Sequence, residues 1–442
     1  MAARITLIRV PLFARSFSAF QAKTAQYQEK SETMSSNLIP PPDVLKEPIK
    51  IPPRQLFGPG PSNMPDAVAH TQSMSLLGHL HPEFLKVMHD VRDGLKYLFQ
   101  TTNDFTMCAS GTGHSGMECA FLNLLERGES LLCVTTGLWG RRAESLGQRL
   151  GLQTFVVEAP QGEVVSVEEI SKAIEQHKPT AMFVCIGESS TGIVQPIQGL
   201  SEACKKHNTL LIADTVSRSS NKSDIFPKKK QSYFFQVASI GAEPFKMDEW
   251  GVDCVYSATQ KVLNAPPGLA PISFSKRAMD KIRNRKTKVA SFYFDALELG
   301  NYWGCDGQIT RYHHTAPISS VYAIRSALSI IANESLEHSW ERHKTNVKLL
   351  HSLLEENGFE CFVQKPENRL ACLTVVKVPQ GVDGKKVTAS LLGKGLEIAN
   401  GLGESAAKLW RIGTFGGNSD EQKIRNVVKM LKDEVQNPTN KL

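Results

Sequence analysis

Short β-rich runs alternate with helical segments from about residue 105 onward, and this alternation constrains the fold more than any other feature of the chain. Strands separated by helical stretches of roughly 10–15 residues are typical of a mostly parallel sheet whose faces are covered by helices. We therefore predict an α/β layer. The runs expected to form its strands lie at 105–110, 131–135, 181–186, 210–213 and 252–257.

Two helices of this layer have clear sequence signals. A glycine-rich turn follows the first run, and we expect a helix from about Ser115 to Leu125 after it. Ser166 and Glu169 have the spacing of a capping box, in which each side chain bonds to the backbone of the other. This box predicts a helix that ends near His177.

The pattern changes near residue 320. A long helical region spans 321–357, and we expect a break near 333–335 and closure by Gly358. Strands are expected after it, at 373–378 and 408–412. This part of the chain therefore has helices followed by strands, which is typical of an α+β arrangement.

The last helix is predicted to begin at Ser419. Asp420 and Glu421 lie in its first turn, where acidic side chains interact favourably with the helix N-terminus. Its apolar residues follow helical spacing, namely Ile424, Val427, Val428, Leu431 and Val435. We predict three parts of the chain: an N-terminal extension at 1–45, a large domain at 46–319 and a smaller C-terminal α+β domain at 320–442.

The net charge of +7 is concentrated in two segments. Residues 1–28 carry four basic residues and no acid, and residues 216–236 carry five basic residues and one acid. Because the remainder is close to neutral, we expect no basic face for nucleic acid. No apolar run reaches the roughly 18 residues of a membrane span, so a membrane is not an expected partner either.

Nine cysteines are present and none forms a Cys-x-x-Cys pair. Cys108, Cys133 and Cys185 fall inside apolar runs expected to be strands. We therefore expect buried, reduced thiols, as in an intracellular protein.

Both ends of the chain resemble targeting signals. The N-terminus mixes basic, apolar and hydroxyl residues and has no acid before Glu29, which is the composition of a mitochondrial transit peptide. The C-terminus, 440–442, reads Asn-Lys-Leu and differs by one residue from the peroxisomal Ser-Lys-Leu signal. We expect the mitochondrial matrix as the destination, with the peroxisome as an alternative or additional one.

Lys261 is the first candidate for chemistry. It follows a β-rich run and precedes the rigid turn 264–268, so its amine is able to act as a nucleophile toward a carbonyl. By itself, a lysine after a strand is more often a solvated surface residue. Asp214, however, ends the apolar run 210–214, and ligands bind at the carboxyl ends of strands in α/β sheets. We expect Asp214 and Lys261 to line one crevice.

These residue types suit one cofactor. A carboxylate beside a pyridine nitrogen favours the protonated ring, which is the electron sink of pyridoxal-phosphate chemistry. The segment 110–114, Ser-Gly-Thr-Gly-His, offers backbone N–H groups and a helix N-terminus to a phosphate. Taken alone, such a glycine-rich turn often serves only close packing.

Together, a set of motifs in the same order resembles the alanine–glyoxylate / serine–pyruvate aminotransferases. The motifs are GPGPSN (58–63), SGTGH (110–114), GLWG (137–140), GESSTG (187–192), Asp214, SATQKVLNAPPG (257–268), YHHT (312–315) and WRIG (410–413). That family consists of class V, fold-type I pyridoxal-phosphate enzymes. The resemblance covers about residues 50–435 and implies that fold, with a large, mostly parallel sheet flanked by helices and a smaller C-terminal α+β domain.

The resemblance implies pyridoxal 5'-phosphate as the cofactor. Lys261 resembles the lysine that holds it as a Schiff base and moves the proton during catalysis. Asp214 is similar to the aspartate paired with the pyridine nitrogen, and Trp139 to the aromatic residue stacked on the ring. The residues that resemble the phosphate cradle are Thr112, Gly113, His114 and Gln260. Ser189 (or Ser190) resembles the group near the ring hydroxyl.

The same resemblance implies a substrate clamp and a homodimer. Arg411 resembles the arginine that grips the substrate carboxylate with two hydrogen bonds. Ser62 and Asn63 are similar to contacts beside that carboxylate. Tyr312 and Thr315 resemble residues that reach the phosphate bound by the neighbouring subunit.

Without the family context, ordinary structural roles stay open for several of these residues. Trp139 is compatible with simple core packing, and Arg411 with a surface salt bridge. We interpret His313 and His314 as structural.

Residues 216–236 depart from the family pattern. They are polar, cationic and turn-rich, and they interrupt the chain just after the aspartate strand. The ends of the segment can be encoded by splice-donor-like and splice-acceptor-like sequences, and its twenty-one codons keep the reading frame. We interpret it as a translated intron, or as an isoform that retains one; the alternative is a genuine surface loop.

The function implied is transfer of an amino group from alanine or serine to glyoxylate, with small amino and oxo acids as ligands. Two alternatives stay open: a 3-hydroxykynurenine transaminase, and a catalytically impaired isoform that acts only as a dimerisation partner. A cysteine desulfurase is less favoured, because Gln260 stands where those enzymes usually have histidine before the lysine.

Overall fold

The computed structural model describes residues 39–215 and 240–441. The chain forms two compact units, at 1–52 and 53–442. The described part of the first unit contains one short 3₁₀ helix, η1 (Asp43–Lys46). All elements of the predicted α/β layer lie in the second unit. The predicted insert at 216–236 lies outside the described residues.

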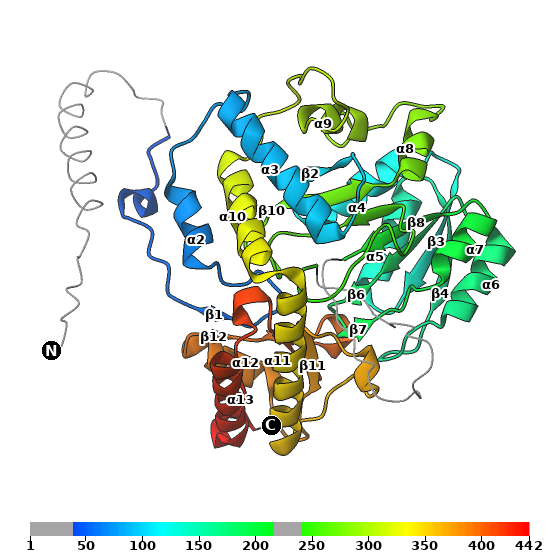
Figure 1. Cartoon of the computed structure of the whole chain (residues 1–442). Helices are drawn as coiled ribbons and strands as arrows, with labels where there is room; N and C mark the ends of the chain where they lie inside the picture. Colours follow the sequence, from blue (N-terminus) through cyan, green and yellow to red (C-terminus); the bar gives the residue numbers. More distant parts are fainter. Residues whose placement is uncertain (1–38, 216–239, 442) are drawn as a thin grey trace, which may run out of the picture. The chain divides into compact units, whose positions relative to one another are not determined.

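A seven-stranded sheet forms the centre of the second unit (Figure 1). Its strands, in spatial order, are β2 (Thr106–Gly111), β10 (Gly268–Phe274), β9 (Cys254–Tyr256), β8 (Leu210–Asp214), β5 (Ala181–Cys185), β3 (Ser130–Thr135) and β4 (Gln153–Glu158). Neighbouring strands run parallel except β10, which is antiparallel to both β2 and β9. The predicted mostly parallel sheet is confirmed.

Strand β10 is not among the predicted strands, and its direction has a simple cause. The chain passes from β9 to β10 through residues 257–267 without a crossover helix. A connection of this kind joins antiparallel neighbours, whereas parallel neighbours need a longer crossover. The turn that carries Lys261 is therefore also the reversal between two strands.

The central strands owe their position to continuous apolar sequence. β5 (AMFVC) and β8 (LLIAD) are buried along their whole length. A parallel strand covered on both faces requires apolar side chains on both sides, which these runs provide. β4 lies at the sheet edge and is only partly buried.

The helices up to residue 302 either cover this sheet or pack on helices that do (Figure 1). They are α2 (Asp66–His70), α3 (Pro82–Phe99), α4 (Gly113–Leu124), α5 (Leu138–Arg149), α6 (Val167–His177), α7 (Leu200–Lys206), α8 (Lys276–Arg283) and α9 (Ala296–Tyr302). The capping box at the start of α6 is present, because the Ser166 hydroxyl accepts from Glu169 N and a Glu169 carboxylate oxygen accepts from Ser166 N. The predicted end of this helix at His177 is also confirmed.

Two long helices follow, α10 (Ile318–Glu334) and α11 (Leu336–Glu356). The break between them lies at Ser335, whose hydroxyl caps α11 by accepting a bond from His338 N at 3.3 Å. Gly358, with a φ of +76°, follows the end of α11. The predicted break and closure are both confirmed.

The remaining elements form the C-terminal part. An antiparallel sheet contains β11 (Leu373–Lys377), β14 (Leu409–Gly413) and β13 (Ala399–Asn400), with helices α12 (Gly384–Gly393) and α13 (Glu421–Gln436). Two small pairs complete the fold: β1 (Gln55–Leu56) with β12 (Leu396–Glu397), and β6 (Gly187–Glu188) with β7 (Ile193–Val194).

The start of α13 differs slightly from the prediction. Asp420, rather than Ser419, is the N-cap, because its carboxylate accepts a bond from Lys423 N at 2.9 Å. The Ser419 carbonyl instead accepts bonds from Arg342 and Asn346 on α11.

Three hydrophobic clusters lie among the described residues of the second unit. One surrounds the seven-stranded sheet, one lies around Phe57 and Trp410, and a small one lies around Val262 and Phe415. Residues 53–442 nevertheless form one compact unit, so the domain boundary near residue 319 stays a prediction.

Two further predictions concern the whole chain. In the described residues, no helix is both long enough and apolar enough to span a bilayer. All nine cysteines are buried, as predicted, and none of them forms a disulfide among the described residues. Burial raises the pKa of the Cys204 thiol to about 12, which keeps it protonated.

Candidate active site

Lys261 lies in a tightly bonded turn five residues after β9. The Ser62 hydroxyl donates to the Lys261 carbonyl at 2.7 Å, and Asn264 N donates to the same carbonyl at 3.0 Å. Thr259 Oγ1 donates to Pro266 O at 2.6 Å and closes the other side of the turn. The lysine backbone is therefore fixed by the Ser62 side chain, which comes from a distant segment, and by bonds within its own turn.

The Lys261 amine points into the protein. Its Nζ donates to Pro59 O and lies 5.6 Å from the centre of the Phe415 ring. Burial lowers the pKa of this amine to about 8, and the charge of Arg411 acts in the same direction. A substantial fraction of the amine is therefore neutral, and nucleophilic, at moderately alkaline pH.

Gly60 is needed for this arrangement. Its φ is +98°, and a Cβ at this position would lie 2.7 Å from Lys261 Nζ. A larger residue would therefore be strained and would also displace the amine. The GPGPSN motif thus shapes the space around the lysine.

Asp214 ends β8 and is almost fully buried. Strand pairing places it beside Tyr256 of β9, and the Tyr256 hydroxyl donates to Asp214 Oδ2 at 2.6 Å. Burial, followed by the nearby Asp214 charge, raises the pKa of Tyr256 well above its ordinary value, so the hydroxyl keeps its proton. The predicted proximity of Asp214 and Lys261 fits the effect of the Asp214 charge, which raises the lysine pKa against the larger effect of burial.

Tyr256 was missed by sequence reasoning. The only signal is a hydroxyl-bearing residue inside an otherwise apolar strand, and its meaning depends on the register between β8 and β9. The structure identifies it as the donor that holds the Asp214 carboxylate.

The glycine-rich segment forms the expected helix start. Thr112 is the N-cap of α4 and Gly113 is its first residue. His114 Nδ1 and Gln260 Oε1 are buried and have no partner among the described residues. Buried polar atoms are rarely left without a partner, so these two point to a polar ligand. Both belong to the predicted phosphate cradle.

Trp139 lies at the start of α5 and is only partly buried. Its indole Nε1 donates to the Ser189 hydroxyl at 2.9 Å. The Ser190 hydroxyl accepts from Leu138 N at 3.0 Å, so it bonds to the helix start instead. Of the two serines proposed for one role, Ser189 is therefore the one that contacts the Trp139 ring.

Arg411 lies on β14 and is 7% exposed, so a surface salt bridge does not describe it. Its Nε donates to Asn400 O at 2.8 Å, and its Nη1 lies 3.5 Å from Ser189 O. Burial lowers the pKa of this guanidinium, and the Glu188 charge opposes that effect. Arg411 is thus close to Ser189, which lies between β6 and β7, and its charge lowers the pKa of Lys261.

Ser62 and Asn63 have structural partners. Ser62 bonds to the lysine turn, while Asn63 Oδ1 accepts from Leu56 N and its Nδ2 donates to Arg54 O, each at 2.8 Å. Their assignment to the substrate carboxylate stays a prediction.

Tyr312 and Thr315 are exposed, and their assignment to a neighbouring subunit's phosphate also stays a prediction. His313 and His314 are hydrogen-bonded to each other through their Nδ1 atoms, and His314 Nε2 contacts the Ser110 hydroxyl at 2.7 Å. These bonds fit the structural interpretation of the two histidines.

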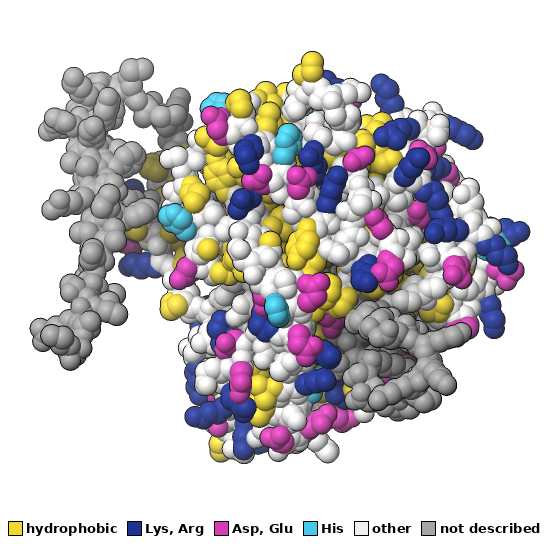
Figure 2. Space-filling model, in the orientation of Figure 1, with side chains coloured by type: hydrophobic (Ala, Val, Ile, Leu, Met, Phe, Trp, Pro, Cys, Tyr) yellow, Lys and Arg dark blue, Asp and Glu magenta, His cyan; other side chains and the backbone are white. Residues whose placement is uncertain are grey.

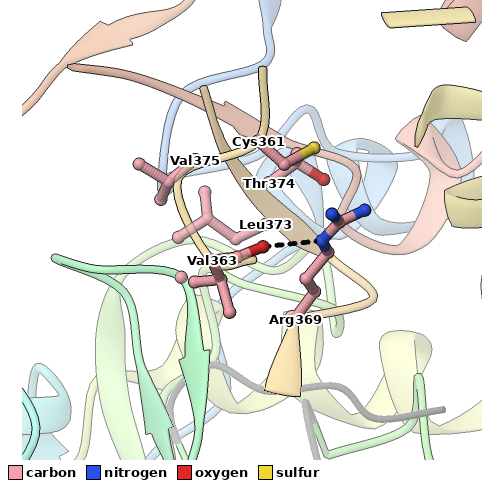
Figure 3. A pocket seen from close by; sticks show the side chains of 7 residues that line it. Cys361, Val363, Arg369, Leu373, Thr374 and Val375 are labelled. Carbon is pink, nitrogen blue, oxygen red and sulfur yellow. Dashed lines mark hydrogen bonds between the residues drawn. The ribbon is translucent and has the colours of Figure 1, made fainter. Parts of the chain in front are cut away.

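A pocket behind the β6–β7 hairpin is not the ligand site. Arg369 points across it, and its Nε donates to Val363 O at 2.8 Å (Figure 3). Gly192 and Thr374 are among its other lining residues. The space admits no water molecule, so it cannot hold a cofactor.

The chain is similar over most of its length to several known proteins. The model of the class-V aminotransferase family matches residues 61–225 and 235–417. The alanine–glyoxylate aminotransferase of Drosophila melanogaster is 44% identical over 400 residues, which cover 90% of this chain and 96% of that protein. The corresponding protein of Callithrix jacchus is 40% identical, covering 93% and 95%. The crystal structure of alanine–glyoxylate aminotransferase from Nostoc sp. has a TM-score of 0.82 and 39% identity, covering 90% of this chain and 100% of that chain.

The lowered lysine pKa generates a prediction. In cofactor-free protein, reductive methylation of Lys261 by formaldehyde and a hydride donor should increase as pH rises through about 8. Arg411→Met should move this midpoint upward, because removal of a neighbouring cation stabilises the protonated amine. Peptide mass spectrometry across a pH series measures both.

Arg369→Met is the matched control, because it removes another largely buried arginine outside the site and should leave the midpoint unchanged. A midpoint that stays the same in Arg411→Met would contradict the proposed electrostatic coupling.

Proposed function

Because the chain belongs to the class-V aminotransferase family, we propose that it transfers the amino group of alanine, or of serine, to glyoxylate. The products are pyruvate, or hydroxypyruvate, and glycine. Several relatives named alanine–glyoxylate aminotransferase share 38–44% identity with the chain over 90% of its length or more. The observation that carries the proposal is a buried, partly neutral Lys261 amine beside a buried carboxylate and a buried arginine.

The residues present fit pyridoxal phosphate. Asp214 supplies a buried carboxylate for a ring nitrogen, and the N-terminus of α4 supplies free backbone N–H groups for a phosphate. His114 Nδ1 is able to donate to that phosphate, and rotation of the Gln260 amide presents a donor in place of its unpaired oxygen. When bound, this cofactor supplies a carbonyl for the substrate amine and a ring that withdraws electrons from the substrate α carbon.

Lys261 moves the proton. In its neutral form Nζ would remove the proton from the substrate α carbon, and as an ammonium it would deliver a proton to the carbonyl carbon of the bound cofactor. A pKa of about 8 lies close to neutral pH, so the amine is able to act in both directions. Its fixed backbone limits the movement that each transfer requires.

Asp214 and Tyr256 would set the charge at the ring nitrogen of the bound cofactor. The Tyr256 hydroxyl stabilises the ionised form of Asp214, because a donated hydrogen bond favours a carboxylate over a carboxylic acid. An ionised Asp214 keeps the ring nitrogen protonated. Trp139, anchored to Ser189, offers a flat surface for stacking on the ring.

Arg411 binds the substrate carboxylate in this proposal. Its Nε donates to Asn400 O, and this bond holds the buried guanidinium in place. The planar guanidinium matches a carboxylate with two parallel hydrogen bonds, which fixes the α carbon relative to Lys261.

We further propose a homodimer. Tyr312 is 58% exposed, and Phe292 and Ile309 in the same part of the chain are 63% and 90% exposed. Figure 2 shows hydrophobic side chains that gather over α3 and α10. Met74 and Leu76, in the segment between α2 and α3, are exposed as well. Exposed apolar patches of this kind mark interfaces, and a partner there would bring Tyr312 toward a second site.

For location, we propose the mitochondrial matrix, supported by the acid-free, basic composition of residues 1–28. The C-terminal signal has weaker support, because Asn440 is buried and bonded to Glu434, and Lys441 pairs with Val382. A receptor that reads a free C-terminal peptide would have to displace these contacts. The peroxisome stays the alternative destination.

The first prediction of this proposal concerns Arg411. Arg411→Lys should raise the KM for alanine by about tenfold, or roughly 1.4 kcal/mol, because a single ammonium cannot replace the two-pronged guanidinium. Steady-state kinetics with glyoxylate as acceptor measure it. A KM within about twofold of the parent value (roughly 0.4 kcal/mol) would show that Arg411 is not the carboxylate clamp.

The second prediction concerns residues 216–236. The family match omits 226–234, inside this segment, and the segment begins two residues after Asp214. Thr215, directly before it, donates to Tyr256 O through both its backbone and its hydroxyl. Deletion of 216–236 should leave a folded protein with tighter pyridoxal-phosphate binding and higher kcat, because the turn after Asp214 becomes short. A long loop costs only roughly 1–2 kcal/mol of closure entropy, so the parent chain should fold too.

Cofactor Kd, kcat and melting temperature are compared for both proteins, purified side by side. A deletion that lowers both stability and activity would identify the segment as native structure and refute the translated-intron interpretation.

The third prediction concerns targeting. A reporter fused to residues 1–30 should enter mitochondria, because the segment is basic and almost free of acid. Fluorescence microscopy with a matrix marker measures it. A diffuse cytosolic reporter would reject this signal and leave the C-terminal residues as the candidate.

A further inference from the structure

Glu188 is a buried carboxylate in the centre of the site, and the proposed chemistry does not use it. It lies at the end of β6 and has no exposed surface. Burial of an ionised carboxylate costs several kcal/mol unless hydrogen bonds compensate it, in order-of-magnitude terms. The position therefore demands a specific set of donors.

Those donors come from two segments that are far apart in the sequence, the start of α5 and Ser190. Glu188 Oε2 accepts from Trp139 N at 2.8 Å, and Oε1 accepts from Ser190 N at 3.0 Å and from the Ser190 hydroxyl. Gly140 N also bonds to this carboxylate. All of these donors are neutral. Burial raises the pKa of Glu188, and these hydrogen bonds oppose the rise and favour the ionised form.

Glu188 acts as the cap of α5. This helix has twelve residues, and its own N-cap, Gly137, has no side chain to offer. Glu188 supplies the acceptor for Trp139 N and Gly140 N instead, and a negative charge at a helix N-terminus is stabilising. A Cβ on Gly137 would lie 2.4 Å from Glu188 Cγ, so glycine is the residue that leaves room for the carboxylate.

The capping fixes Trp139 at both ends. Its backbone N–H is bonded to Glu188, and its indole Nε1 to Ser189, the next residue in the chain. The ring proposed to stack on the cofactor is thus oriented by one short hairpin segment. Movement of that segment would move the ring.

The opposite side of the hairpin faces Arg411. Its Nη1 lies 3.5 Å from Ser189 O, and the Glu188 charge favours the ionised guanidinium. Among the described residues, Arg411 donates hydrogen bonds to two backbone carbonyls, those of Asn400 and Ser189. Glu188 therefore offsets the arginine charge from a distance and leaves the guanidinium free to pair with a substrate carboxylate.

We infer that Glu188 is a positioning residue that couples the Trp139 helix to the Arg411 substrate clamp. The inference rests on the proposed function. It states that one buried charge supports cofactor binding and amino-acid binding together. Loss of that charge should weaken cofactor binding and amino-acid binding together. Loss of a residue with a purely structural role would instead lower stability without weakening both kinds of binding.

Glu188→Gln tests the inference in the full chain. The substitution preserves shape, removes the charge and turns one acceptor oxygen into a donor that faces backbone N–H groups. We expect the Kd for pyridoxal phosphate and the KM for alanine each to rise about tenfold, while kcat at saturation changes less. The Kd is measured by quenching of tryptophan fluorescence when pyridoxal phosphate is titrated into cofactor-free protein, so it does not depend on turnover.

Glu434→Gln is the matched control. Glu434 is also a buried carboxylate with several polar partners, but it lies on α13 and bonds to Lys394 and Asn440. Its substitution should lower the melting temperature and leave both constants unchanged. A double variant with Arg411→Lys adds a second test, because coupled residues give a KM increase smaller than the product of the two single increases.

The outcomes separate the two proposals. A parent protein without alanine–glyoxylate transfer refutes the proposed function. A normally active parent, together with a Glu188→Gln variant whose Kd or KM stays within about twofold, overturns the inference alone. If Glu188→Gln does not fold, Ser190→Ala takes its place. This variant keeps the charge but loses one hydroxyl donor, and we expect both constants to rise by about threefold; a rise in only one of them overturns the inference.

Discussion

The side-chain amide of Asn264 is the interaction on which the site depends. Its Nδ2 donates to the Ser62 hydroxyl at 2.6 Å and to Phe415 O at 3.2 Å, and its Oδ1 accepts from Gly417 N at 2.7 Å. Three segments far apart in the sequence therefore meet at one buried amide. Because Asn264 lies in the turn that carries Lys261, the position of the amine is set by this junction. A buried amide with all partners satisfied specifies one geometry, since any displacement leaves polar groups unpaired.

Around this junction, opposite charges are buried close together and are held by neutral donors. Asp214 is held by Tyr256, and Glu188 by backbone N–H groups and Ser190. The two cations respond to the same environment. Burial lowers the pKa of both Lys261 and Arg411, but only the amine is brought to about 8, while a guanidinium stays charged. Lys261 thus suits its proposed role as a base, and Arg411 suits its proposed role as a binding site for an anion.

Much of this was predictable from the sequence, for physical reasons. Continuous apolar runs predicted the central strands, and the strand-end rule predicted that Asp214 lies near Lys261, which fits the effect of the Asp214 charge on the lysine pKa. The residues that support the site were not predictable, because Tyr256 and Glu188 act through bonds that depend on strand register and on a short hairpin. For the same reason, the structural bonds of Asn63 could not be anticipated from its motif.

The central claim is that the buried Lys261 amine holds the cofactor and performs the proton transfers. Incubation of the full chain with pyridoxal phosphate, reduction with borohydride and peptide mass spectrometry test it directly. The account predicts one predominant modified peptide, the one that contains Lys261, because this amine combines a lowered pKa with a prepared site for ring and phosphate. Predominant modification of another lysine, with Lys261 unmodified, would contradict it.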